Sequence, residues 1–168
     1  MKLPIGSYKL VAIASKGTQP VQINSITEAI FPDNKPSDNA SYCDDITLKQ
    51  GNNTQTIELK RVVSVFRLLP TDKRPSNFKS IEATITGNCS NVLDPSTGLA
   101  NTSAAQGVKR TIDISNYDPT QNTALAFYCF LRSKSEKVDV DICLKDGPGG
   151  NELKALSFKD VPLQPNYR

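Results

Sequence analysis

The stretch Leu59–Leu69, which reads LKRVVSVFRLL, constrains the fold more than any other part of the sequence. β-branched and aromatic residues dominate it, and Pro70 ends it because proline has no N–H to donate to a neighbouring strand. Apolar side chains occupy both alternating faces, which indicates a strand covered on both sides. A helix is the competing interpretation, but the valines and the lack of a capping residue disfavour it. We therefore predict a central β-strand around which the chain is organised.

The 168 residues suffice for one domain with a substantial core. The net charge is only +3, and the basic pairs Lys60-Arg61, Lys73-Arg74 and Lys109-Arg110 lie far apart, which argues against a nucleic-acid partner. No apolar run approaches the roughly 20 residues that span a bilayer. The opening residues show no signal peptide, so the chain is either cytosolic or a mature or trimmed form. Abundant Asn, Ser, Thr and Pro, with neither His nor Trp, favour an exported all-β domain.

Alternation between apolar and polar residues predicts further half-buried strands. They are Tyr8–Ala14, Phe78–Thr86, Lys109–Ser115 and, more weakly, Leu153–Phe158. Ile46–Lys49 and Thr54–Leu59 flank a turn sequence, which predicts a hairpin that leads into the central strand.

The strongest hairpin pattern joins Ala124–Arg132 to Lys137–Lys145. In the second arm, one face is apolar and the other carries Asp139, Asp141 and Cys143. This arm is therefore expected to be half-solvated. The apolar face consists of Val138, Val140, Ile142 and Leu144.

The remaining stretches are irregular. Pro20–Ile30 predicts either a short helix capped by Ser25 or an irregular arm, and Phe31–Ala40 carries loop signals. Gly87–Gln106 is a long polar loop, which is expected to be mobile or functional.

Six to eight strands without a clear helix predict an antiparallel β-sandwich that forms a single domain over residues 1–168.

The sequence offers little catalytic chemistry. Without histidine there is no Ser-His-Asp triad and no histidine metal ligand. The carboxylate pairs Asp44-Asp45 and Asp139/Asp141 could hold calcium, but a solvated strand face explains the second pair better. Gly147–Gly150 lacks the Lys-Ser/Thr that follows a phosphate-binding loop, so a turn is the better interpretation. We predict no catalytic residue, metal or cofactor site, and no enzyme activity.

The four cysteines have no CxxC spacing, which disfavours zinc and thioredoxin chemistry. Three pairings are open to them. In a tight hairpin Cys129 and Cys143 would face opposite sides of the sheet, so a bond between them is disfavoured. Cys43 and Cys89 both lie in predicted loops and are the preferred disulfide pair, while Cys129 can be a small buried apolar residue.

Three stretches together resemble the fimbrillin-type subunits of Bacteroidales surface fimbriae, among them the minor or anchor subunits. The first is Leu3–Ala12, which is similar to the family's proline-glycine-tyrosine entry strand. The second is Leu59–Val65 with the following Phe78–Ile81 and Thr86-Gly87, and it is similar to the arginine-led strand and its successor. The third is the closing Val161–Arg168, which in the family leads into a further strand.

This resemblance implies a transthyretin-like β-sandwich that is exported as a lipoprotein and displayed on the outer membrane. Its partners would be other fimbrial subunits, joined by strand exchange after an Arg-specific protease removes an N-terminal strand. The chain departs from the family in having no lipobox cysteine or signal peptide and in ending early. We therefore expect an excised N-terminal domain, whose only link to the membrane is a lipid anchor outside this chain. Arg61, in the predicted central strand, is a poor processing site.

Two functions follow as expectations. The first is a stalk, anchor or tip subunit of a cell-surface fimbria that assembles by strand donation and supports adhesion. The second is an adhesin module that does not polymerise and binds a host or bacterial surface glycan or matrix ligand through Gly87–Gln106. The first also predicts an unpaired sheet edge beside an apolar groove.

Overall fold

The computed structural model describes residues 3–71, 74–117 and 124–165. This part of the chain is all-β, with one short 3-10 helix (Pro32–Asn34) and no α-helix. The strands are β1 (Gly6–Ser15), β2 (Gln22–Ser25), β3 (Glu28–Ile30), β4 (Asn39–Leu48), β5 (Lys60–Arg61), β6 (Ser64–Leu68), β7 (Ser80–Gly87), β8 (Cys89–Ser90), β9 (Val92–Asp94), β10 (Leu99–Ala100), β11 (Val108–Asp113), β12 (Leu125–Leu131), β13 (Glu136–Lys145) and β14 (Glu152–Leu163).

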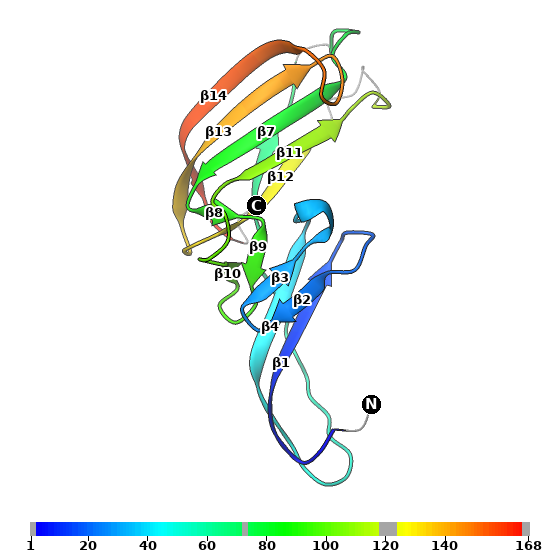
Figure 1. Ribbon diagram of the computed structural model, residues 1–168, viewed down its shortest axis with the longest axis vertical. Helices are drawn as coiled ribbons and strands as arrows, with labels where there is room; N and C mark the ends of the chain where they lie inside the picture. The colour runs from blue at the N-terminus through cyan, green and yellow to red at the C-terminus, as the bar shows by residue number, and fades with distance from the viewer. Residues whose placement is uncertain (1–2, 72–73, 118–123, 166–168) are drawn as a thin grey trace.

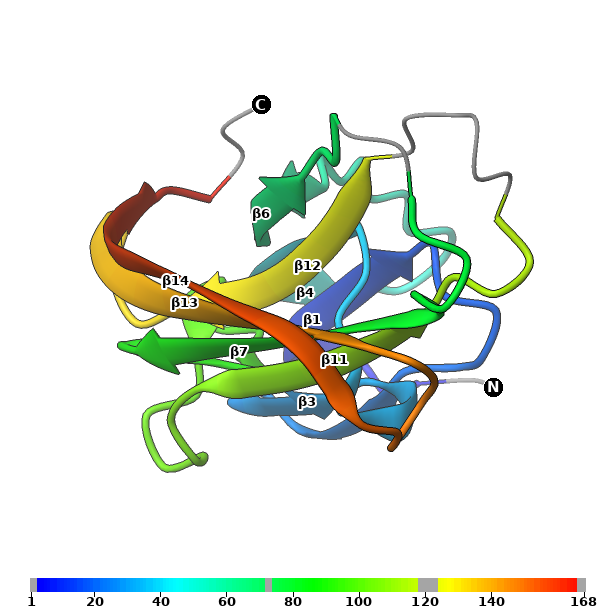
Figure 2. The same cartoon turned by 90° about the horizontal axis from the view of Figure 1, so that it is seen from above.

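The strands form four antiparallel sheets, with the orders β1-β4-β5, β10-β9-β3-β2, β11-β7-β13-β14 and β6-β12-β8. In Figure 1 the sheet β11-β7-β13-β14 occupies the upper part of the molecule, and the long β1–β4 ladder extends to the lower tip. Figure 2 shows β6 and β12 on one side of the upper sheet. The predicted strands Tyr8–Ala14, Phe78–Thr86 and Lys109–Ser115 are confirmed, each to within a few residues of β1, β7 and β11.

Two clusters of buried side chains hold these sheets together. The upper core lies between β11-β7-β13-β14 and β6-β12-β8, and the lower core joins β3, β9 and β10 to residues 62–63. The upper core consists of Phe78, Ile81, Ala83, Ile85, Cys89, Val108, Ile114, Leu125, Phe127, Cys129, Leu131, Val138, Val140, Ile142 and Leu163. The lower core consists of Ala29, Phe31, Val62, Val63, Leu93, Ala100 and Phe130.

Strand β12 belongs to both cores. Phe127, Cys129 and Leu131 point into the upper core, while Phe130 points into the lower core and packs against Phe31, with the rings tilted at a centroid distance of 5.2 Å. Successive side chains of a strand alternate between its faces, and here both faces are covered. The strand buried on two sides is therefore β12, which the sequence analysis assigned to a hairpin arm.

The prediction of one central strand over Leu59–Leu69 is wrong. The stretch divides into β5, which pairs with β4, and β6, which pairs with β12 and lies at the edge of its sheet. Between them Val62 and Val63 enter the lower core, and the Val62 N–H donates to the Asn39 carbonyl at 3.1 Å. The apolar pattern on both faces arises because the stretch crosses from one core to the other.

The predicted hairpin between Ala124–Arg132 and Lys137–Lys145 is also wrong, although both strands exist. β13 pairs with β7 and β14, whereas β12 pairs with β6 and β8 in the opposite sheet. The connection 132–135 therefore turns a corner between sheets. The expected inward face of β13 is confirmed, because Val138, Val140 and Ile142 are buried in the upper core. Period-two alternation fits a hairpin and a sheet-to-sheet connection equally well.

Two other segments differ from expectation. Pro20–Ile30 forms the hairpin β2–β3, and the Ser25 hydroxyl accepts the Thr27 N–H in its turn, so the predicted helix cap serves a turn instead. Residues 54–59 form no strand, so the predicted hairpin after Ile46–Lys49 lacks its second arm. The Asn53 side chain closes that turn by bonding the Lys49 N–H and carbonyl at 2.9 and 2.8 Å.

Candidate functional site

The segment Gly87–Gln106 is not the open loop that the sequence predicted. It contains β8, β9 and β10, and Cys89, Leu93 and Ala100 are almost fully buried. The two turns that remain exposed are ordered by side chains, since the Asp94 carboxylate accepts the Ser96 N–H at 2.9 Å and the side-chain amide oxygen of Asn101 accepts the Ser103 N–H at 2.8 Å. Buried apolar residues spaced among many polar ones hid these short strands from pattern analysis.

The carboxylate pairs are engaged by neighbouring side chains. Asp45 binds Lys9 at 2.8 Å, Asp139 binds Lys159 at 3.1 Å, and Asp141 accepts the Ser157 hydroxyl at 2.6 Å. The hydrogen bond from the Asp160 N–H and then that from Lys159 hold the pKa of Asp139 below its ordinary value. Among the described residues no group of three or more His, Cys, Asp and Glu side chains is placed to hold a metal ion.

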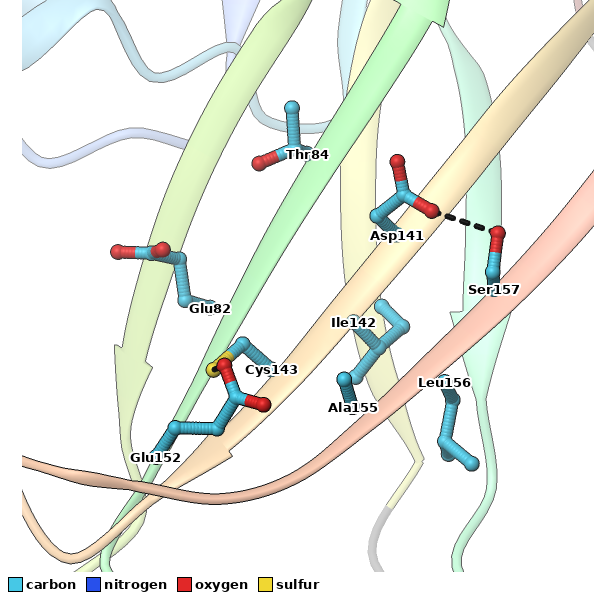
Figure 3. A pocket seen from close by; sticks show the side chains of 9 residues that line it. All are labelled: Glu82, Thr84, Asp141, Ile142, Cys143, Glu152, Ala155, Leu156 and Ser157. Atoms are coloured by element: carbon cyan, nitrogen blue, oxygen red, sulfur yellow. Dashed lines mark hydrogen bonds between the residues drawn. The ribbon is translucent and has the colours of Figure 1, made fainter.

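A shallow hollow of about 330 Å³ lies on the outer face of β7, β13 and β14 (Figure 3). Glu82 is its most buried carboxylate and bridges Lys109 at 3.0 Å and Lys145 at 3.4 Å. Burial raises the pKa of Glu82, but the hydrogen bonds from these two lysines outweigh it and leave the pKa below its ordinary value. The hollow is lined by Glu82, Thr84, Asp141, Ile142, Cys143, Glu152, Ala155, Leu156 and Ser157.

The thiol in this hollow is not activated. Cys143 donates a hydrogen bond to the Glu152 carboxylate at 3.1 Å, as Figure 3 shows. Burial, and then the adjacent Glu152 carboxylate, raise the pKa of Cys143. Because the thiolate is the nucleophile, a raised pKa keeps this cysteine in its unreactive form. The hollow can accept polar groups, but these side chains supply no paired nucleophile and base.

The predicted Cys43–Cys89 disulfide is not formed in the structure, in which all four cysteines are free thiols. Cys43 lies in β4 opposite Val11, whereas Cys89 lies in the upper core, where its thiol donates to the Ile85 carbonyl at 3.8 Å. The expected separation of Cys129 and Cys143 rested on a hairpin that is not formed; the two lie in different sheets, with Cys129 in the upper core and Cys143 lining the outer hollow.

The predicted unpaired sheet edge is present, while the apolar groove beside it stays a prediction. β1 spans ten residues, pairs only with β4, and is the outermost strand of its sheet among the described residues. Its central residues Leu10–Ile13 are only partly buried. Apolar residues that flank this sheet are exposed, with Ile5 just before β1 at 69% and Leu59 just before β5 at 40%. β14 is a second long edge, and Phe158 on it contacts Phe66 of the edge strand β6 at a centroid distance of 5.7 Å.

The basic pairs lie mostly in ordered structure. Arg61 is 14% exposed and binds Asp38 at 2.6 Å, and Arg110 of β11 donates to the Pro36 carbonyl at 3.3 Å. Arg74 donates to the carbonyl of Tyr117 at 2.9 Å, while its neighbour Lys73 lies outside the described residues. Sequestration of Arg61 agrees with the expectation that it is a poor processing site.

No protein-family model, curated protein or solved structure matches this chain. Within the described residues no helix has the length and apolar character needed to cross a membrane.

Proposed function

We propose that this chain is a structural subunit of a bacterial cell-surface fimbria, and that it assembles with other subunits through β-strand addition to the outer edge of β1. The resemblance of Leu3–Ala12, Leu59–Val65 and Val161–Arg168 to fimbrillin-type subunits supports the proposal. So does the all-β fold, which we interpret as a single-domain, transthyretin-like sandwich. The role is structural and not enzymatic, and the subunit is exported and held at the outer membrane through a lipid anchor.

The observation that carries the proposal is the contrast between the two long edges. β1 reads GSYKLVAIAS, with Lys9 as its only charge and an unbroken ten-pair register with β4. β14 instead has four charged residues, Pro162 and two register irregularities against β13. Charges, proline and bulges protect sheet edges from pairing with other chains, and β1 has almost none of these features. Strand addition to β1 would use its backbone for affinity and its alternate side chains for register.

The test is light scattering of the wild-type chain over a concentration series. The edge variant is Leu10→Lys, whose new ammonium group would lie opposite Asp44 within the ladder but would be costly to bury under an added strand. The matched control is Leu153→Lys on β14, where the native side chain is 42% exposed.

We expect multimers for the wild type and for Leu153→Lys, and a monomer for Leu10→Lys. A wild-type chain that stays monomeric at every concentration, or equal association of both variants, would contradict assembly through β1. Circular dichroism of each variant verifies that the fold is kept.

The alternative is an adhesin module that binds a surface glycan or matrix ligand. Its support is the pair of ordered polar turns in Gly87–Gln106, where Ser96, Thr97, Thr102 and Ser103 are exposed on a rigid base. Shortening this segment would remove core residues such as Leu93, so the test uses exposed side chains only. Reproducible glycan-array binding that is lost in Thr97→Ala and kept in a control such as Thr47→Ala would favour the adhesin.

A further inference from the structure

The upper core contains two cysteines whose side chains meet. Cys89 and Cys129 are each 0% exposed and are held by different strands, β8 and β12, which pair directly. We propose that Cys89 and Cys129 form a structural disulfide when the chain folds in the presence of a thiol–disulfide oxidant. This inference does not depend on the fimbrial role or on association through β1.

The register of the two strands places both side chains on one face. Leu131 lies opposite Cys89, and Cys129 is two residues before Leu131, so the two cysteines are diagonal neighbours that point into the same core. Both side chains are fully buried in the same cluster of core residues. Neither of the other cysteines competes, because Cys43 lies in the β1–β4 ladder and Cys143 points out of the opposite sheet.

The two thiols are chemically unequal. The hydrogen bond from Cys129 lowers the pKa of Cys89, against the effect of burial, and the nearby Arg132 charge acts in the same direction. The same contact, together with burial, raises the pKa of Cys129. These pKa differences belong to the closed core, so they do not decide which thiol reacts first while the core is still open.

The bond forms by two exchange steps with a small-molecule disulfide such as oxidised glutathione. The thiolate of either cysteine attacks one sulfur and releases one glutathione thiolate, and the thiolate of the other cysteine then attacks the cysteine sulfur of this mixed disulfide and releases the second. The cysteines lose two protons and two electrons in total, and two molecules of reduced glutathione carry them away. Since both thiols are buried in the folded chain, the exchange takes place before the upper core closes.

The bond would tie the Gly87–Gln106 segment to β12, the strand shared by the two cores. It would close a loop of about 40 residues, which restricts the unfolded chain and so favours the folded state. We expect the midpoint of thermal unfolding to rise by about 10 °C on oxidation.

The experiment refolds the reduced, urea-unfolded chain in a buffer of reduced and oxidised glutathione. Free thiols are then alkylated under denaturing conditions and the peptides are identified by mass spectrometry. We expect a linked Cys89–Cys129 peptide, a mass lower by about 2 Da than that of the reduced protein, and alkylated Cys43 and Cys143. Alkylation of both Cys89 and Cys129, or a link from either to another cysteine, would overturn the proposal.

Two variants sharpen the result. The double variant Cys43→Ser/Cys143→Ser keeps both core thiols, and we expect it to form the bond and to lose thermal stability on reduction like the wild type. Cys129→Ala cannot form the bond, so its midpoint of thermal unfolding should be the same under oxidising and reducing conditions. If Cys129→Ala does not fold, peptide mapping of the wild type and of the double variant still decides the question.

Discussion

At the scale of single residues, the ion pair between Arg61 and Asp38 is one of two largely enclosed pairs among the described residues, the other being Lys145 with Glu82. The Arg61 Nε lies 2.6 Å from the Asp38 Oδ1, and the side chains are 14% and 27% exposed. The Arg61–Asp38 pair connects β5 to the residue just before β4, directly before Val62 and Val63 enter the lower core. Removal of one partner leaves the other charge partly desolvated, which costs more than loss of an exposed pair.

We predict that Asp38→Asn lowers the free energy of unfolding by about 2 kcal/mol at pH 7. The control is Asp33→Asn, because Asp33 is 79% exposed in its 3.5 Å contact with Lys35 and the change should cost at most about 0.5 kcal/mol. Urea unfolding followed by circular dichroism measures both. Equal losses in the two variants would show that enclosure of the Arg61 pair adds no stability.

The same pair gives a pH dependence with a definite sign. Burial raises the pKa of Asp38, but the hydrogen bond and charge of Arg61 outweigh it, so the folded-state pKa is lower than the unfolded-state value. The stabilisation is therefore present above the unfolded pKa of about 3.9 and is lost as the pH falls through the folded pKa. Wild type and Asp38→Asn should converge in stability over that acidic range. If the difference in unfolding free energy between the two proteins stays constant down to the lowest measurable pH, the pH dependence predicted for this pair is contradicted.

At the scale of elements, the segment Gly87–Gln106 gives the clearest test of the structure against the sequence pattern. Leu93 of β9 is 0% exposed in the lower core, whereas Leu69 is 55% exposed. We predict that Leu93→Ala costs about 3 kcal/mol of stability and Leu69→Ala less than about 1 kcal/mol. Thermal and urea unfolding provide the measurement. If Leu93→Ala causes no loss of stability, the segment is instead the mobile loop that the sequence pattern predicts.

Much of the strand content could be read from the sequence, but the partners of each strand could not. Alternation located β7, β11 and the inward face of β13 because one side of each meets the core. It could not distinguish a hairpin from a corner at 132–135, because both connections keep the same period. The sequence also could not show that β1 is an edge strand. The apolar run Leu10–Ile13 is typical of a buried strand, and only the structure shows that β1 pairs on one side alone. Contact between Cys89 and Cys129 depends on the same long-range pairing.

For the whole molecule, the shared strand β12 determines how the chain unfolds. Phe130 fills the lower core, and its neighbours Cys129 and Leu131 fill the upper core. If β12 detaches from one core, the side chains that it contributes to the other core are withdrawn as well, and both cores become exposed to water. We predict a single cooperative transition, in which far-ultraviolet and near-ultraviolet circular dichroism give the same midpoint. Phe130→Ala should lower that midpoint for both signals together, and two separate transitions would contradict the coupling.

The β1–β4 ladder also determines how the molecule responds to mechanical force. Its Gly6 end lies at the lower tip, while the other end of each strand joins the body of the molecule (Figure 1). A pull on Gly6 away from the upper core acts along β1 and perpendicular to its hydrogen bonds with β4. The ten paired positions then resist sliding together, whereas a pull across the strands would open them one at a time. A load applied at this tip therefore acts along the direction in which the β1–β4 ladder is most resistant to rupture.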